Sequence, residues 1–128
     1  MREKRLLQAA VLVAGLVPTG SGLAGVLLGP EMAGSLEGAD AALNSHFRYL
    51  SGLLLGLGLC FWSLVPKIER RAEAFRLLTV VVVVGGLGRA WGLVSDPDPG
   101  EAMRLALVME LVVTPALCLW QARVARRG

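Results

Sequence analysis

The chain has 128 residues, of which 55% are hydrophobic and only 18% are charged. With a mean hydropathy of +0.62, it has too few polar residues to cover the surface of a water-soluble domain of this size. The apolar residues are also collected into long blocks, which is typical of a membrane protein. Length and composition therefore predict one integral membrane domain, residues 1–128, and exclude an ordinary soluble enzyme.

Four apolar blocks define the predicted elements, and each is expected to form a membrane-spanning α-helix. The first begins at Leu6 and continues well past Val17, which makes it longer than the apolar core of a signal peptide. The second is expected to begin near Ala41, because Asp40 is a good N-cap residue and AALNSHFRYL contains no Pro or Gly. The predicted spans are about 6–28, 41–65, 77–94 and 103–121.

Charge is distributed unevenly between the two ends of these helices. The N-terminus, the second connection and the C-terminus hold ten of the 13 basic residues, so the positive-inside rule places both termini in the cytoplasm. The pI of about 9.4 reflects this topology, and no nucleic-acid-binding surface is indicated. The first and third connections hold six of the ten acidic residues, namely Glu31, Glu37, Asp40, Asp96, Asp98 and Glu101.

Glycine and proline positions predict how the helices pack. Small residues allow close backbone approach in lipid, so GxxxG pairs are expected at helix contacts. Pro18 and Pro115 should kink or locally unwind the first and fourth helices, the latter by leaving the Leu111 carbonyl without its usual partner. Such breaks often line cavities, although simple packing kinks are the alternative. The GxxxG pairs are Gly25 with Gly29, Gly52 with Gly56, and Gly88 with Gly92.

Arg89 and Glu110 are charged residues within apolar sequence. Arg89 follows five valines and three glycines in TVVVVVGGLGRAWG, and Glu110 is the one acidic residue inside the four blocks. A charged side chain facing lipid costs about 2.5–3.5 kcal/mol on insertion scales. Both side chains are therefore expected to face the interior of the bundle and to pair with each other. Such a pair either contacts a ligand or only fixes helix packing.

The second predicted helix adds polar residues at a similar depth. Asn44 and Arg48 lie four residues apart and share one face, which His46 and Tyr49 flank. Arg48 snorkelling to lipid headgroups and His46 capping the helix are the alternatives to ligand contact. With one histidine and no clustered acids, no metal site or cofactor is predicted. The candidate ligand-binding residues are Arg89, Glu110, Arg48, Asn44, His46 and Tyr49.

The order and spacing of these motifs resemble a known family. Asn44-x-His46-Phe47-Arg48-Tyr49-x-x-Gly52, then Gly85-Gly86-x-Gly88-Arg89, then Glu110-Leu111 are similar to the pattern of small bacterial four-span membrane proteins known as domain of unknown function 4345. The resemblance covers roughly residues 5–123. It implies an all-α, four-helix bundle in the bacterial inner membrane, emphasises Arg48, Arg89 and Glu110, and brings no established activity.

Three functions are compatible with the sequence. One is a site for a small amphipathic or anionic ligand, such as a lipid or a quinone headgroup; the catalytic residues, if any, are unknown, with Glu110 or His46 as proton-transfer candidates. Another is an accessory subunit that meets a second copy or a membrane complex through its glycine faces. The third, a small proton-coupled transporter, is disfavoured because the acidic residue lies in the fourth helix and the charge bias commits the chain to one orientation.

Overall fold

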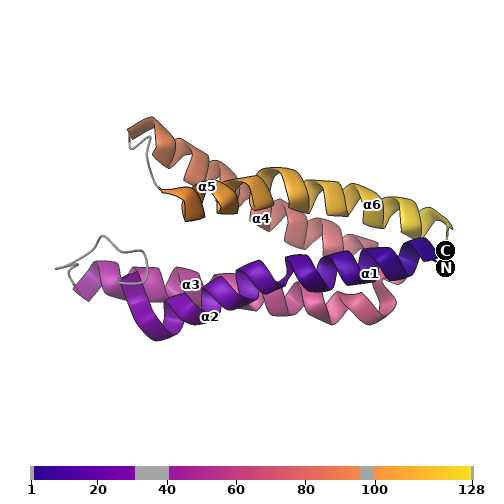
Figure 1. Cartoon of the computed structure of the whole chain (residues 1–128), viewed down its shortest axis with the longest axis horizontal. Helices are drawn as coiled ribbons and strands as arrows, with labels where there is room; N and C mark the ends of the chain where they lie inside the picture. The colour runs from indigo at the N-terminus through magenta and orange to yellow at the C-terminus, as the bar shows by residue number, and fades with distance from the viewer. Residues whose placement is uncertain (1, 31–40, 96–99, 128) are drawn as a thin grey trace. The chain divides into compact units, whose positions relative to one another are not determined.

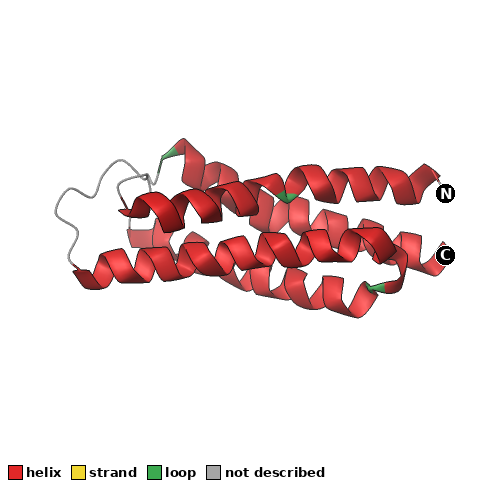
Figure 2. Ribbon diagram, turned by 90° about the horizontal axis from the view of Figure 1, so that it is seen from below, coloured by secondary structure: helices red, strands yellow, loops and turns green. Residues whose placement is uncertain are grey.

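The computed structural model describes residues 2–30, 41–95 and 100–127 (Figure 1). Every regular element in these ranges is a helix (Figure 2), as the apolar blocks predict. The proposed cap Asp40 and the acidic residues Glu31, Glu37, Asp96 and Asp98 lie outside the described residues. The elements are α1 (Arg2–Ala14), α2 (Leu16–Leu28), α3 (Ala41–Leu64), η2 (Val65–Arg70), α4 (Ala72–Ser95), α5 (Glu101–Val108), η3 (Met109–Val113) and α6 (Thr114–Arg127).

Four helical stretches are long and apolar enough to cross a membrane. α1 with α2 forms one such stretch, α3 with η2 another, and α5, η3 and α6 together form the last. The predicted all-α class with four membrane-length helices is therefore confirmed. The stretches are Arg2–Leu28, Ala41–Arg70, Ala72–Val94 and Met103–Arg127.

The first stretch is interrupted at Gly15, which separates α1 from α2. Pro18 lacks an N–H, so the carbonyl of Ala14 loses its helical partner, and the interruption confirms the predicted break. The indole Nε1 of Trp62 on α3 donates to the Leu12 carbonyl at 3.1 Å. A Cβ on Gly15 would collide with this indole ring, so only glycine leaves room for the bond.

The chain divides into two compact units, Ala9–Val65, and Met1–Gln8 with Pro66–Gly128. We call them the α2–α3 unit and the α4–α6 unit. In the first, α2 runs beside α3 with backbone-to-backbone contact (Figure 1). A Cβ on Gly22 would overlap the backbone of Leu55, and one on Gly58 would overlap Thr19. These glycines let the two helices approach more closely than any larger residue permits.

The prediction that GxxxG pairs mark the contacts is right for α2 and wrong for α3 and α4. A Cβ on Gly25 would meet Ser51, whereas one on Gly52 would lie 3.8 Å from its nearest neighbour, an ordinary separation. Within the described residues, a Cβ on Gly56 or on either glycine of the α4 pair would meet nothing within 4 Å. Spacing permits close approach, but the face on which two helices meet depends on all the residues that they bury.

The tightest packing of the α4–α6 unit lies near the chain termini. Leu7, Ile68 and Phe75 are fully buried there, and Val124 is nearly so. Gln121 is also fully buried, and its Nε2 donates to the Ile68 carbonyl at 2.7 Å. This bond ties α6 to η2 at a carbonyl that also accepts the backbone N–H of Arg71 at 3.4 Å.

Candidate functional site

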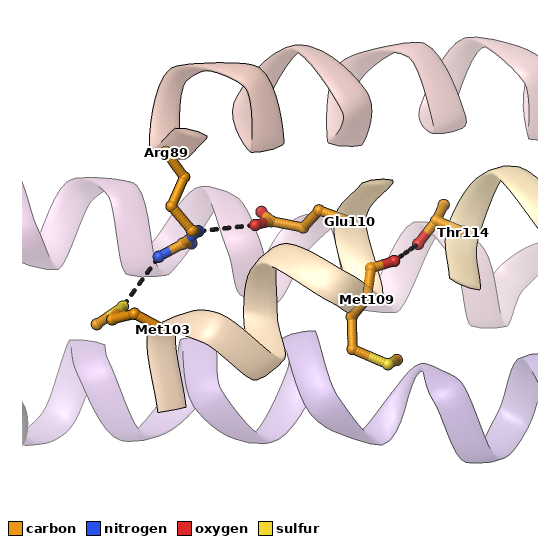
Figure 3. A network of polar contacts seen from close by, with 5 residues as sticks. All are labelled: Arg89, Met103, Met109, Glu110 and Thr114. Carbon is orange, nitrogen blue, oxygen red and sulfur yellow. Dashed lines mark hydrogen bonds and ion pairs between the residues drawn. The ribbon is translucent and has the colours of Figure 1, made fainter. Parts of the chain in front are cut away.

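Arg89 and Glu110 form the predicted ion pair. Arg89 lies in the last third of α4, and Glu110 is the second residue of η3. The Nε of Arg89 donates to Oε1 of Glu110 at 2.7 Å (Figure 3). The side chains are 32% and 15% exposed. The pairing of these two charges is therefore confirmed, and neither stands alone against lipid.

Met103 is the third member of the site, and it is not among the residues predicted from the sequence. Its Sδ accepts a hydrogen bond from Nη1 of Arg89 at 2.9 Å (Figure 3). Met103 precedes Glu110 by seven residues, which is about two helical turns and places both on one side of the fourth stretch. The seven-residue spacing could therefore have identified Met103 from the sequence. The thioether itself is only a weak acceptor, so it satisfies the guanidinium poorly.

The guanidinium has donors left over. It carries five N–H bonds, of which the contacts to Glu110 and Met103 use one on Nε and one on Nη1. Among the described residues, Nη2 of Arg89 and Oε2 of Glu110 make no hydrogen bond. The pair is held through a single oxygen rather than through the two-point contact that arginine and carboxylates often form. Donor and acceptor capacity therefore remain side by side.

A local widening of the fourth helical stretch positions Glu110. Pro115 cannot donate to the Leu111 carbonyl, and the preceding turn, η3, is a π-helix, which bears out the predicted disturbance. Thr114 compensates, because its backbone N–H and its Oγ1, the latter at 2.8 Å, both bind the carbonyl of Met109 (Figure 3). Single π-turns are frequent at functional sites because they re-aim side chains without breaking the helix.

Gly86 brings α4 close to this turn. A Cβ at Gly86 would lie 2.8 Å from the Leu111 side chain and 3.0 Å from Cβ of Glu110. Arg89 follows Gly86 by three residues and therefore projects from the same side of α4. The close approach at Gly86 sets the distance over which the guanidinium meets the carboxylate.

Arg48 has a different environment in the α2–α3 unit. Its Nη1 donates to the carbonyl of Val26 at 2.6 Å, and its Nε donates to Oδ1 of Asn44 at 3.2 Å. Gly29 ends α2 with a φ of 73°, and a Cβ there would lie 2.7 Å from Nη2 of Arg48. The guanidinium thus caps the carboxyl end of α2, where carbonyls lack partners and the helix dipole favours a cation.

His46 and Tyr49 lie apart from the Arg48 contacts. Both are exposed, Tyr49 at 62%, because they project from α3 on other sides than Asn44 and Arg48. The six candidate residues therefore divide between the two units, with Arg89 and Glu110 in one and the other four in the other. That all six contact one ligand stays a prediction. Within the described ranges, no group of three or more His, Cys, Asp or Glu residues is placed to hold a metal ion.

Comparison with known proteins yields one match. A family model described as "Domain of unknown function (DUF4345)" matches residues 6–121, nearly the whole chain. No curated protein and no solved structure matches this chain. The matched range includes the Arg89–Glu110 pair, Met103 and both helix interruptions. The description names no activity.

Proposed function

The chain belongs to the family of domain of unknown function 4345, and we propose its function from the Arg89–Glu110 site. We propose that it is a multi-pass protein of the bacterial inner membrane that binds a small amphipathic or anionic ligand, lipid- or quinone-like, at Arg89. Its four membrane-length helices support the membrane assignment. The capacity of the Arg89 guanidinium for further hydrogen bonds supports the binding of a ligand.

The unused donors on Arg89 carry this proposal. A guanidinium among apolar side chains gains stability from each acceptor it finds, because an unsatisfied polar group in such surroundings is costly. Glu110 supplies one oxygen and Met103 a weak sulfur acceptor. A carboxylate, a phosphate or a quinone carbonyl offers the oxygen that Nη2 lacks, and charge-assisted bonds of this type are the stronger ones.

The depth of the site favours a ligand that reaches it along the lipid. Arg89 precedes the last residue of α4, Ser95, by six positions, which at 1.5 Å per residue is about 9 Å of helix. Met103 is the third residue of α5. Leu105 and Val108, on the same helix as Met103, are 60% and 49% exposed, so α5 also presents apolar surface. A charged head beside an apolar border suits an amphipathic molecule.

The charge bias supports a cytoplasmic location of both termini and hence a site in the outer half of the membrane. Single-cysteine labelling tests this orientation after Cys60 and Cys118 are replaced by serine. A membrane-impermeant maleimide applied to intact cells should modify Glu101→Cys and spare Arg126→Cys. The reverse pattern would overturn the orientation and move the site to the inner half.

Native mass spectrometry of protein purified in mild detergent tests ligand binding. A small molecule should accompany the wild type and be lost from Arg89→Gln and from Glu110→Gln. Arg104→Gln serves as the matched control, because Arg104 is an exposed arginine of α5 in the same unit. Circular dichroism confirms that each variant is folded. Retention of the molecule by folded Arg89→Gln would refute the site.

A second function is favoured by a separate observation on α4. Gly85 and Gly88 are exposed, and among the described residues a Cβ at either would meet nothing within 4 Å. Glycines on an open helix face permit another helix to pack closely in lipid. In this alternative the chain is an accessory subunit and the Arg89–Glu110 pair only fixes helix packing. Co-purification of a protein partner that Gly85→Leu abolishes, with no small molecule bound, would support it.

A further inference from the structure

The α4–α6 unit concentrates positive charge at the end that contains both chain termini. The ion pairs of Glu3 with Arg123 and Arg127, at 3.2 and 3.0 Å, join the start of α1 to the end of α6, which lie at the same end of the view in Figure 1. Lys4 pairs with Glu69 of η2 at 3.1 Å. The N-terminal residues, η2, the start of α4 and the end of α6 therefore form one surface, which we call the basic end.

The charges of the basic end do not balance. The only acidic residues in these segments are Glu3, Glu69 and Glu73, and the first two already hold three of the basic side chains. The basic residues number ten, a surplus of seven positive charges. They are Arg2, Lys4, Arg5, Lys67, Arg70, Arg71, Arg76, Arg123, Arg126 and Arg127.

The uncompensated side chains are exposed. Lys67, Arg70 and Arg71 fall within five residues around the turn between η2 and α4, and within the described part of the chain none of their side chains has a hydrogen bond or ion pair. Arg2, Arg5 and Arg126 are also exposed. Like charges held this closely repel one another and lower the stability of the compact state unless counter-charge is supplied.

The counter-charge must come from molecules that lie where the apolar stretches end. Arg70 and Arg127 are the last residues of two of these stretches, Arg2 begins a third and Ala72 a fourth. Arginine and lysine stems lie along apolar surface and place their charge among lipid headgroups. Basic clusters at this position attract anionic lipids, whereas a soluble acidic partner would have to displace those lipids.

We infer that the basic end is a binding surface for phospholipids with anionic headgroups, centred on Lys67, Arg70 and Arg71. It is distinct from the site at Arg89, which lies toward the opposite end of α4. Phosphate oxygens accept hydrogen bonds from the exposed guanidinium groups, and their charge offsets the surplus. Bound anionic lipid therefore stabilises the α4–α6 unit.

Lipid retention in detergent tests this inference. The full chain is mixed with equal amounts of dioleoyl phosphatidylglycerol and dioleoyl phosphatidylcholine, and bound lipids are counted by native mass spectrometry. Wild type should retain phosphatidylglycerol about tenfold over phosphatidylcholine, and Arg70→Gln/Arg71→Gln should lose most of that preference. Phosphatidylglycerol should also raise the melting temperature of wild type more than that of this variant.

Two further variants separate charge from damage to the fold. Arg70→Lys/Arg71→Lys keeps both charges and should retain the preference, and Arg104→Gln, which removes a charge outside the basic end, should leave it unchanged. Equal retention of both lipids by wild type would overturn the inference, as would an undiminished preference in folded Arg70→Gln/Arg71→Gln. Stabilisation by soluble poly-glutamate but not by phosphatidylglycerol would also overturn it, and would point to an acidic protein partner.

Discussion

Each of the two units contains a half-buried arginine, and the two arginines have different hydrogen-bond acceptors. In the α2–α3 unit, Arg48 donates to a backbone carbonyl at the end of a neighbouring helix, and Asn44 fixes its orientation. In the α4–α6 unit, Arg89 meets a carboxylate and a sulfur on the facing helix. The helices differ accordingly, because α2 and α3 touch through glycines at backbone distance, whereas α4 faces a widened turn around Glu110.

A half-buried arginine is structural or available for binding according to the acceptors around it. The backbone carbonyls at a helix end are fixed in place, and they bind the cation without adding a formal charge. A carboxylate held through one oxygen can be joined or exchanged by another anion. Arg48 is therefore expected to govern stability, whereas Arg89 is expected to govern stability and, under the proposed function, ligand binding.

The largest effect is expected from breaking the Arg89–Glu110 pair. Glu110→Gln leaves the guanidinium without its counter-charge and should lower the free energy of unfolding by about 3 kcal/mol. Unfolding in mixed micelles with increasing dodecyl sulfate, followed by circular dichroism, measures this. Arg89→Met/Glu110→Leu should recover most of the loss, because apolar replacement of both partners removes the unpaired charge. A double variant less stable than Glu110→Gln would contradict this account.

The glycine contact of the α2–α3 unit should rank second. A Cβ on Gly22 would overlap the backbone of Leu55, which cannot rotate aside, so Gly22→Ala should cost about 2 kcal/mol. Gly20 on the same helix is the matched control, since a Cβ there meets nothing within 4 Å among the described residues. The same dodecyl sulfate titration should find Gly20→Ala neutral or slightly stabilised. Equal destabilisation by both variants would show that helix propensity, and not close approach, is at work.

A third, smaller effect should follow removal of the helix cap. Arg48→Met keeps the length of the side chain but loses the bonds to the Val26 carbonyl and Asn44, at an expected cost of about 1.5 kcal/mol. Hydrogen exchange should show the loss confined to the end of α2. Ligand retention at Arg89 should be unchanged in the same preparation. Loss of the bound molecule in folded Arg48→Met would instead place Arg48 in the binding site.

The smallest effect is expected at the widened turn. Thr114→Val preserves shape and removes the Oγ1 bond to Met109, while the backbone bond from the same residue to that carbonyl remains. The free energy of unfolding should fall by about 0.5 kcal/mol, with Thr114→Ser near wild type. The measurement is again the micelle titration. A loss above that of Arg48→Met would mean that the hydroxyl is essential to the turn.

The helical class, the four long apolar stretches and the pairing of Arg89 with Glu110 could all be predicted from the sequence. Each follows from one strong constraint, because lipid requires backbone bonds to close within a helix and makes an isolated charge expensive. The breaks near Pro18 and before Pro115 could also be predicted from the sequence, because a missing proline N–H disturbs the helix locally.

Which glycines make contact and which acceptors each arginine binds depend on how the helices pack. Gly22, Gly58 and Gly86 make the close approaches, and most of the GxxxG pairs do not, because many helix faces permit contact and side-chain packing selects one of them. Arg48 could not be assigned to the α2 carbonyls without knowing where α2 ends beside α3. Local rules act along one helix, whereas partners on another helix depend on how both are placed.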